Sequence, residues 1–191
     1  MLKSALKEWA VATEALVHGE AIVLLRKGGI REVGGRFSVE FDRVWLYPTF
    51  EHQQPQLLKS PYADAVQPVE SGWHPETLTI RALADITEIF QVSDPDIVSA
   101  LLPFHVWNEA FVRDRLRWKV REPLYVLLLR VFRVDPPHQI PYRSQYGGCK
   151  SWIELEQALS TEGAIEVMGD RAYAERVSAI REIIAGTSAS V

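Results

Sequence analysis

A cation falls within an apolar arc of the predicted helix 109–118. The apolar positions of this stretch are Phe111, Val112, Leu116 and Trp118. At about 100° per residue they share one side of a helix, and Arg115 falls among them, whereas Arg113 and Arg117 fall opposite. A charge on a buried face needs a partner or a ligand. Arg115 is therefore either paired with an internal carboxylate or available to bind an anion.

A second cation, Arg130, shares a face of the predicted strand 124–134 with aliphatic and aromatic residues. Such an arginine either pairs inward or lines a cleft. The surrounding segment 110–133 holds seven bases and two acids, with Trp118 and Tyr125 among them. Basic residues interleaved with aromatic ones suit nucleic-acid backbones and bases. The alternative is a solvated helix face above aromatic residues of the core.

Arg26 and Lys27 stand directly before two glycines, at the end of a predicted strand. Glycines at this point would let backbone amides approach an anion beside the two cations. The stretch lacks the spacing of a Walker loop and of a dinucleotide-binding fingerprint. A plain hairpin turn is therefore the competing interpretation.

The tripeptide Glu51-His52-Gln53 lies where a strand is expected to give way to a loop. A carboxylate, an imidazole and an amide together could move a proton or bind a metal. The sequence contains no H-x-x-x-H or H-E-x-x-H pattern, so we expect neither a metal site nor a cofactor. Another histidine, His105 in the segment PFHVW, is either a partner for such a site or a buried hydrogen-bonding residue.

Hydrophobic periodicity and capping residues predict the elements that position these side chains. Strands are predicted at 21–25, 37–41, 44–47, 77–92 and 124–134. Helices are predicted at 4–17, 55–59, 95–102, 109–118, 151–159 and 170–186. Strand 124–134 is apolar on both faces, which predicts a central position in a sheet, and Pro136-Pro137 is expected to end it.

The order of these elements is not the regular alternation of a doubly wound sheet. It predicts an α+β fold with a mostly antiparallel, curved sheet or small partial barrel, packed helices and a C-terminal helical extension. We expect a single α+β domain over residues 1–155 and a C-terminal helical appendage over 156–191 that packs on it.

Composition limits the classes of protein that fit this chain of 191 residues. No run approaches the ~18–20 apolar residues of a membrane span, and the N-terminus lacks the layout of a signal peptide. A single cysteine, Cys149, excludes an internal disulfide, so we expect a cytoplasmic protein without a membrane partner. Residues 151–191 hold 7 acids and 3 bases, so this tail carries the net charge of −4, and such a tail can mask locally basic surface ahead of it.

Several segments resemble, in order, an uncharacterised bacterial family defined as a domain of unknown function. These segments are KEWA, LLRKGGIRE, FSVEFDRVWLYPTFEHQ, PLYVLLLRVFRV and YGGCKSW. The similarity spans about residues 3–155 and implies no activity. Some members of the family look to be associated with restriction-type endonuclease domains, so the resemblance implies a role connected with nucleic acid.

Three hypotheses follow from these residues. The first is a non-catalytic binding module for nucleic acid or another anionic ligand. Its groove would be lined by Arg26, Lys27, His52, Gln53, Arg115, Trp118 and Arg130. The second is an enzyme on a small anionic substrate, with Glu51 and His52 as acid–base pair and an arginine as anion clamp. The third is a structural or interaction protein whose polar residues form a buried network.

Overall fold

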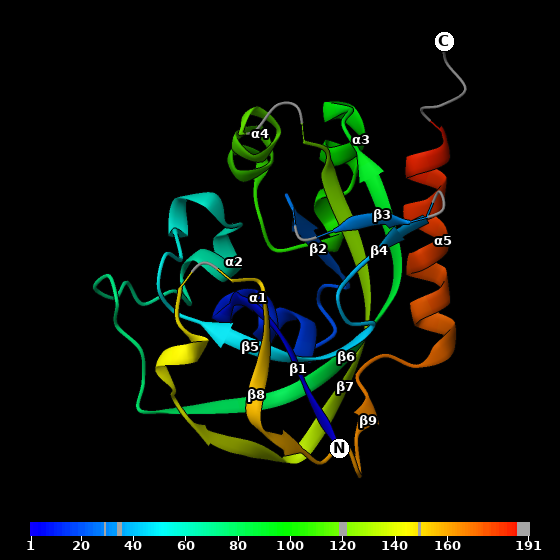
Figure 1. Ribbon diagram of the computed structural model, residues 1–191. Coiled ribbons are helices and arrows are strands. Elements are labelled where there is room, and N and C mark those ends of the chain that lie inside the picture. The colour runs from blue at the N-terminus through cyan, green and yellow to red at the C-terminus, as the bar shows by residue number, and fades with distance from the viewer. Residues whose placement is uncertain (29, 34–35, 119–121, 149, 187–191) are drawn as a thin grey trace.

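Nine strands, several short helices and one longer C-terminal helix follow one another along the described chain (Figure 1). The computed structural model describes residues 1–186 apart from 29, 34–35, 119–121 and 149. The strands are β1 (Leu2–Trp9), β2 (Val23–Arg26), β3 (Arg31–Val33), β4 (Arg36–Ser38), β5 (Arg43–Thr49), β6 (Thr77–Val92), β7 (Leu124–Pro141), β8 (Trp152–Leu159) and β9 (Ile165–Glu166). The α-helices are α1 (Ala10–Val17), α2 (Ser60–Ala63), α3 (Pro95–Ala100), α4 (Glu109–Arg117) and α5 (Asp170–Gly186). Short 3₁₀ turns are η1 (Pro55–Leu57), η2 (Leu102–Phe104) and η3 (Ser144–Tyr146).

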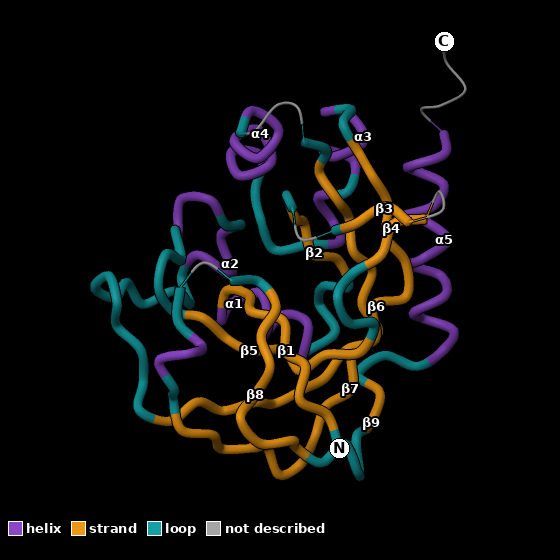
Figure 2. The backbone as a smooth tube through the Cα atoms, in the orientation of Figure 1, coloured by secondary structure: helices purple, strands orange, loops and turns teal. Residues whose placement is uncertain are grey.

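One seven-stranded sheet holds the molecule together. Its strands are hydrogen-bonded in the order β2-β7-β6-β5-β1-β8, and β9 adds to β7, while β3 and β4 form a separate pair. Among the described residues of this sheet, only β1 and β5 pair in parallel. The long strands β6 and β7 pair with two register shifts, and such bulges bend a sheet (Figure 2). The predicted α+β fold with a mostly antiparallel, curved sheet is confirmed.

The sheet is buried on both faces because alternate side chains enter two different apolar clusters. In β5, Val44 and Leu46 join the larger cluster, which also includes α1 and α4 residues, whereas Trp45 and Tyr47 join the smaller one. Successive side chains of a strand point to opposite faces, so a strand between two cores is apolar throughout. The same reasoning predicted a central position for 124–134, and β7 does lie between β2 and β6.

Two predicted helices are strands or begin as strands. The segment 4–17 is β1 followed by α1, because residues 2–9 pair with both β5 and β8. The segment 151–159 is β8, in which Ile153 and Leu155 are buried and Glu154 and Glu156 are exposed. Ser151 and Glu154 have the spacing of a capping box, which favours a helix, but pairing with β1 prevails because sheet contacts override weak local propensities.

The predicted end of the strand at Pro136-Pro137 is also wrong. Strand β7 continues to Pro141, and its second half pairs with the first residues of β6. The two prolines fall at the register shift between Ile80 and Ala82, where no ladder partner is needed. Strand 77–92 and the helices begun by Pro95 and Asn108 are confirmed.

The C-terminal helix lies along the outside of the sheet, beside β6 and β7 (Figure 1). Its residues Tyr173, Val177 and Ile180 are buried in the larger cluster. The predicted boundary at residue 155 falls within β8, and the division into domain and appendage stays a prediction. None of the helices in the described part of the chain is long and apolar enough to cross a membrane.

Candidate functional site

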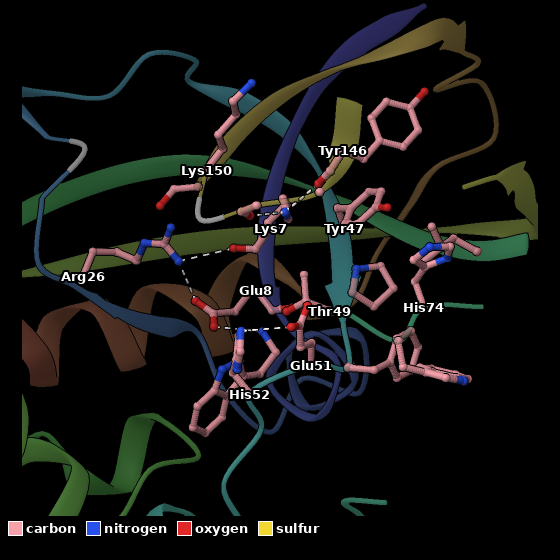
Figure 3. Close-up of a pocket in the computed structure, with 18 of the residues that line it drawn as sticks. Lys7, Glu8, Arg26, Tyr47, Thr49, Glu51, His52, His74, Tyr146 and Lys150 are labelled. Carbon is pink, nitrogen blue, oxygen red and sulfur yellow. Dashed lines mark hydrogen bonds and ion pairs between the residues drawn. The ribbon is translucent and has the colours of Figure 1, made fainter. Parts of the chain in front are cut away.

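A cleft of about 820 Å³ opens where β1, β2 and β5 meet α4 and three loops, which follow β5, precede β6 and connect β7 to β8 (Figure 3). Its described cationic side chains are Lys7, Arg26, Lys27, Arg115 and Lys150, and its described carboxylates are Glu8 and Glu51. Five cations against two carboxylates make the cleft locally positive, although the whole chain has a net charge of −4. Aromatic rings form much of the remaining lining. The arrangement suits an anion that also carries planar or apolar groups.

Glu8 forms a buried ion pair inside the cleft. Its carboxylate lies 2.8 Å from a terminal nitrogen of Arg26, and the side chains are only 8% and 13% exposed. The other carboxylate oxygen accepts a hydrogen bond from the Trp9 backbone amide. Arg26 also donates to the carbonyl of Lys7. The ion pair therefore fixes the end of β2 against β1 and presents a carboxylate and a guanidinium side by side (Figure 3).

Sequence reasoning missed Glu8. A helical interpretation of residues 4–17 placed it outside the apolar face, where a glutamate needs no explanation. In a strand, the alternation of buried residues brings it next to Arg26, which lies 18 positions along the chain. An interpretation of residues 2–9 as a strand would have identified Glu8, because the strand places its carboxylate among buried neighbours.

Arg115 lies against aromatic rings. Its guanidinium carbon is 4.9 Å from the ring centroid of Phe111 and 5.4 Å from that of Trp118, distances typical of cation–π contacts. Burial lowers the pKa of Arg115, with the Glu8 carboxylate acting against this shift and the Arg26 cation adding to it. No residue in the described part of the chain accepts a hydrogen bond from Arg115, so its donors are available to a ligand.

Glu51 and His52 line the same cleft and are 3.2 Å apart between Glu51 Oε1 and His52 Nε2. The same carboxylate oxygen accepts hydrogen bonds from the Gly72 amide and the Ser71 hydroxyl, and these bonds lower the pKa of Glu51. His52 has a left-handed backbone, with φ of 66°, which is uncommon for a residue other than glycine. Glu51 thus anchors the 71–72 loop, and its low pKa makes it a weak base.

Gln53 does not line the cleft. Its side-chain oxygen accepts a hydrogen bond from the backbone amide of Val11, in the first turn of α1, and its side-chain nitrogen donates to the carbonyl of Phe50. Both contacts are within the protein. Gln53 therefore holds the start of α1 against the loop after β5, a structural role that the sequence pattern could not separate from ligand binding.

Lys7 and Lys27 border the cleft and hold its rim together. Lys7 Nζ donates to the carbonyls of Tyr146 and Gly148, at 2.6 and 2.8 Å. Lys27 Nζ donates to the carbonyls of Leu116 and Trp118. The turn after Arg26 is thus connected to the end of α4, far along the chain. Cys149, the single cysteine of the chain, lies outside the described residues.

Arg130 lies away from the cleft, contrary to the expectation that it lines the same groove. It pairs with Glu166 and with Asp170, and its guanidinium carbon is 5.5 Å from the ring centroid of Tyr173. The two carboxylates neutralise the charge of Arg130, and the hydrogen bonds that Arg130 donates to them raise its pKa. Arg130 is a connection between the sheet and the start of α5, because its partners come from β9 and α5.

Replacing Arg130 by glutamine is expected to lower the free energy of unfolding by about 1 kcal/mol, since the ion pairs are partly exposed. Denaturant unfolding measures this loss. The variant Asp170→Asn should lose a similar amount, and the double variant should lose less than the sum of the two. Fully additive losses would show that Arg130 and Asp170 act independently.

Within the described residues, no three histidine, cysteine or carboxylate side chains form a group that could hold a metal ion.

Residues 5–179 match the family described as "Domain of unknown function (DUF1802)". The chain belongs to this family. The DUF1802 match continues past residue 155, where the similarity of the sequence motifs ends, and reaches into α5.

A search of curated proteins found no match to this DUF1802 chain. Among solved structures, the fold is similar to that of ASCH from Zymomonas mobilis, with 18% identity and a TM-score of 0.47 over 81% of this chain and 87% of that one. A mutant form of the same Zymomonas mobilis protein gives 16% identity and a TM-score of 0.46, over 81% of this chain and 88% of that one. A likeness of this degree concerns chain topology and does not extend to the side chains of a site.

Proposed function

We propose that this DUF1802 domain is a non-catalytic binding module that holds a nucleic acid in the cleft. The observation that carries the proposal is the lining of the cleft, in which five cations from four segments of the chain lie together with several aromatic rings. Cations bind the phosphate backbone and release its counterions, while aromatic rings stack on bases. Among the side chains chosen from the sequence, Arg26, Lys27, His52, Arg115 and Trp118 all line it.

An enzyme that uses Glu51 and His52 is the second candidate. The 3.2 Å contact between their side chains, inside the same cleft, supports it. Against it, Glu51 already accepts hydrogen bonds from Ser71 and Gly72 that lower its pKa. A general base works best with a pKa near the working pH, so this carboxylate is poorly suited to the task. The binding module is therefore the better supported function.

The test compares two arginines of α4 that differ in position only. Arg115→Gln removes a cation of the cleft, and Arg113→Gln removes an exposed cation of the same helix outside it. For a single-stranded oligonucleotide at low salt, we expect Arg115→Gln to weaken binding about tenfold and Arg113→Gln to leave it within about twofold. Fluorescence anisotropy provides the dissociation constants.

Salt dependence provides the second readout. The logarithm of the affinity should fall linearly with the logarithm of the salt concentration, and Arg115→Gln should flatten that slope by about 0.7 if one phosphate contact is lost. Equal losses in the Arg115 and Arg113 variants would place binding outside the cleft. An oligonucleotide that does not bind even at low salt would refute the proposal.

A further inference from the structure

Four planar groups contact one another in succession at the α4 side of the cleft. Phe111 and Arg115 are four residues apart in α4 and share one side of the helix, while Trp107 precedes the capping residue Asn108 and Trp118 follows the last residue of the helix. The rings of Trp107 and Phe111 are stacked, with centroids 4.8 Å apart and an interplanar angle of 15°. The Arg115 guanidinium then contacts Phe111 and Trp118 in turn.

The exposed fraction of the aromatic side chains rises from Trp107 through Phe111 to Trp118. Trp107 is 1% exposed and Phe111 3%, whereas Trp118 is 47% exposed and still lines the cleft. Large aromatic side chains stabilise a fold by being buried, and an exposed tryptophan beside a pocket is typical of a binding surface. The outer part of Trp118 thus offers a flat apolar surface next to the cations of the cleft.

The same cleft offers a hydrogen-bonding pair. Glu8 presents carboxylate oxygens and Arg26 presents guanidinium donors, and the two are held 2.8 Å apart in a fixed arrangement. An acceptor and a donor side by side match the edge of a nitrogen heterocycle, which also presents donors and acceptors next to each other. Arg115 is close enough to both groups for their charges to change its pKa.

The volume of the cleft restricts the ligand. About 820 Å³ falls in the range of ~300–1,000 Å³ that is typical of sites for small molecules. A planar base with its sugar and phosphate fits such a volume. In a duplex, the bases are already stacked and paired, so their faces are not accessible to a tryptophan.

We infer that the cleft takes an unpaired nucleobase of a single-stranded nucleic acid, which stacks on Trp118 as the next plane of the succession. This inference rests on the proposed function and deepens it. The neighbouring phosphates contact the cations of the cleft, and the edge of the base faces the Glu8–Arg26 pair. Trp118 thereby supplies a contact that depends on the base, whereas Arg115 supplies one that depends on the charge.

The experiment compares two oligomers of equal length and charge: an eight-nucleotide oligothymidylate and an abasic oligomer with the same sugar-phosphate backbone. Wild-type protein should bind the oligothymidylate at least about tenfold more tightly, because base–aromatic stacking contributes to this ligand alone. Trp118→Leu should lose about tenfold for oligothymidylate and stay unchanged for the abasic oligomer. Trp118→Phe, which keeps a flat ring, should remain close to wild type for both. Quenching of tryptophan fluorescence by oligothymidylate should be reduced in both variants.

The outcomes separate this inference from the proposed function. Equal wild-type affinity for the two oligomers, or an equal loss for both in Trp118→Leu, overturns base stacking and leaves binding through the cations in place. Failure of both oligomers to bind overturns the proposed function and the inference together. Thermal unfolding of Trp118→Leu is the control for folding, and the half-exposed position of the ring predicts little change.

Discussion

Lowering the pH from 7.5 to 4.5 is expected to reduce the free energy of unfolding by about 2.5 kcal/mol through His105 alone. The side chain is 2% exposed, and burial, reinforced by the nearby Lys59 cation, lowers its pKa to about 3. In the unfolded chain a histidine takes up its proton at about pH 6.5. Between these two values the unfolded state binds more protons, so stability is complete above pH 6.5 and falls as the pH falls towards 3.

Denaturant unfolding at a series of pH values measures this dependence. Carboxylates also contribute to the dependence of the free energy of unfolding on pH. The contribution of His105 is therefore the difference between the curve of the wild type and the curve of His105→Phe. In that variant the slope should be flatter by up to about 1.4 kcal/mol per pH unit below pH 6. An unchanged slope in His105→Phe would contradict the prediction.

Replacing Glu8 by glutamine is expected to lower the free energy of unfolding by about 3 kcal/mol. Glutamine can still accept the hydrogen bond from the Trp9 amide, so the main change is the loss of negative charge. Arg26, only 13% exposed, would then keep its charge without its carboxylate, and the Arg115 cation is nearby. A charge left alone in a buried position is costly, whereas removing both charges costs much less.

Two variants test this explanation by denaturant unfolding. The double variant Glu8→Gln/Arg26→Gln should be more stable than Glu8→Gln, because it removes the unpaired charge of Arg26 and its repulsion with Arg115. Glu154→Gln, on the exposed side of edge strand β8, should change stability by less than about 0.5 kcal/mol. If Glu8→Gln is as mild as Glu154→Gln, the ion pair does not stabilise the domain.

The elements that the sequence predicted well are those with strong local signals. Asn108 caps α4 by accepting a hydrogen bond from the Phe111 amide, and Asp94 caps α3 in the same way. Strand β6 has β-branched residues throughout, and its predicted bounds agree with the structure. Such signals act between residues a few positions apart, so they are visible without tertiary contacts.

The missed elements depend on partners that are far away along the chain. Strand β1 is placed between β5 and β8, and β8 is a strand because it pairs with β1. Each segment has a pattern that is compatible with a helix when it is considered alone. Their conformation is decided by backbone pairing between segments distant in sequence, and no local pattern records that pairing.

The candidate site also has features that the sequence predicts and features that only the folded chain decides. The position of Arg115 on an apolar arc follows from helical spacing, and this was visible in the amino-acid order alone. That Arg115 lies near Glu8 and Arg26, while Arg130 pairs with Asp170 instead, follows only from the folded chain. Helical spacing is a property of neighbours in sequence, whereas an ion pair or a cleft forms between segments that the sheet brings together. The residue types therefore limited the chemistry, and the tertiary contacts selected which cations remain available to a ligand.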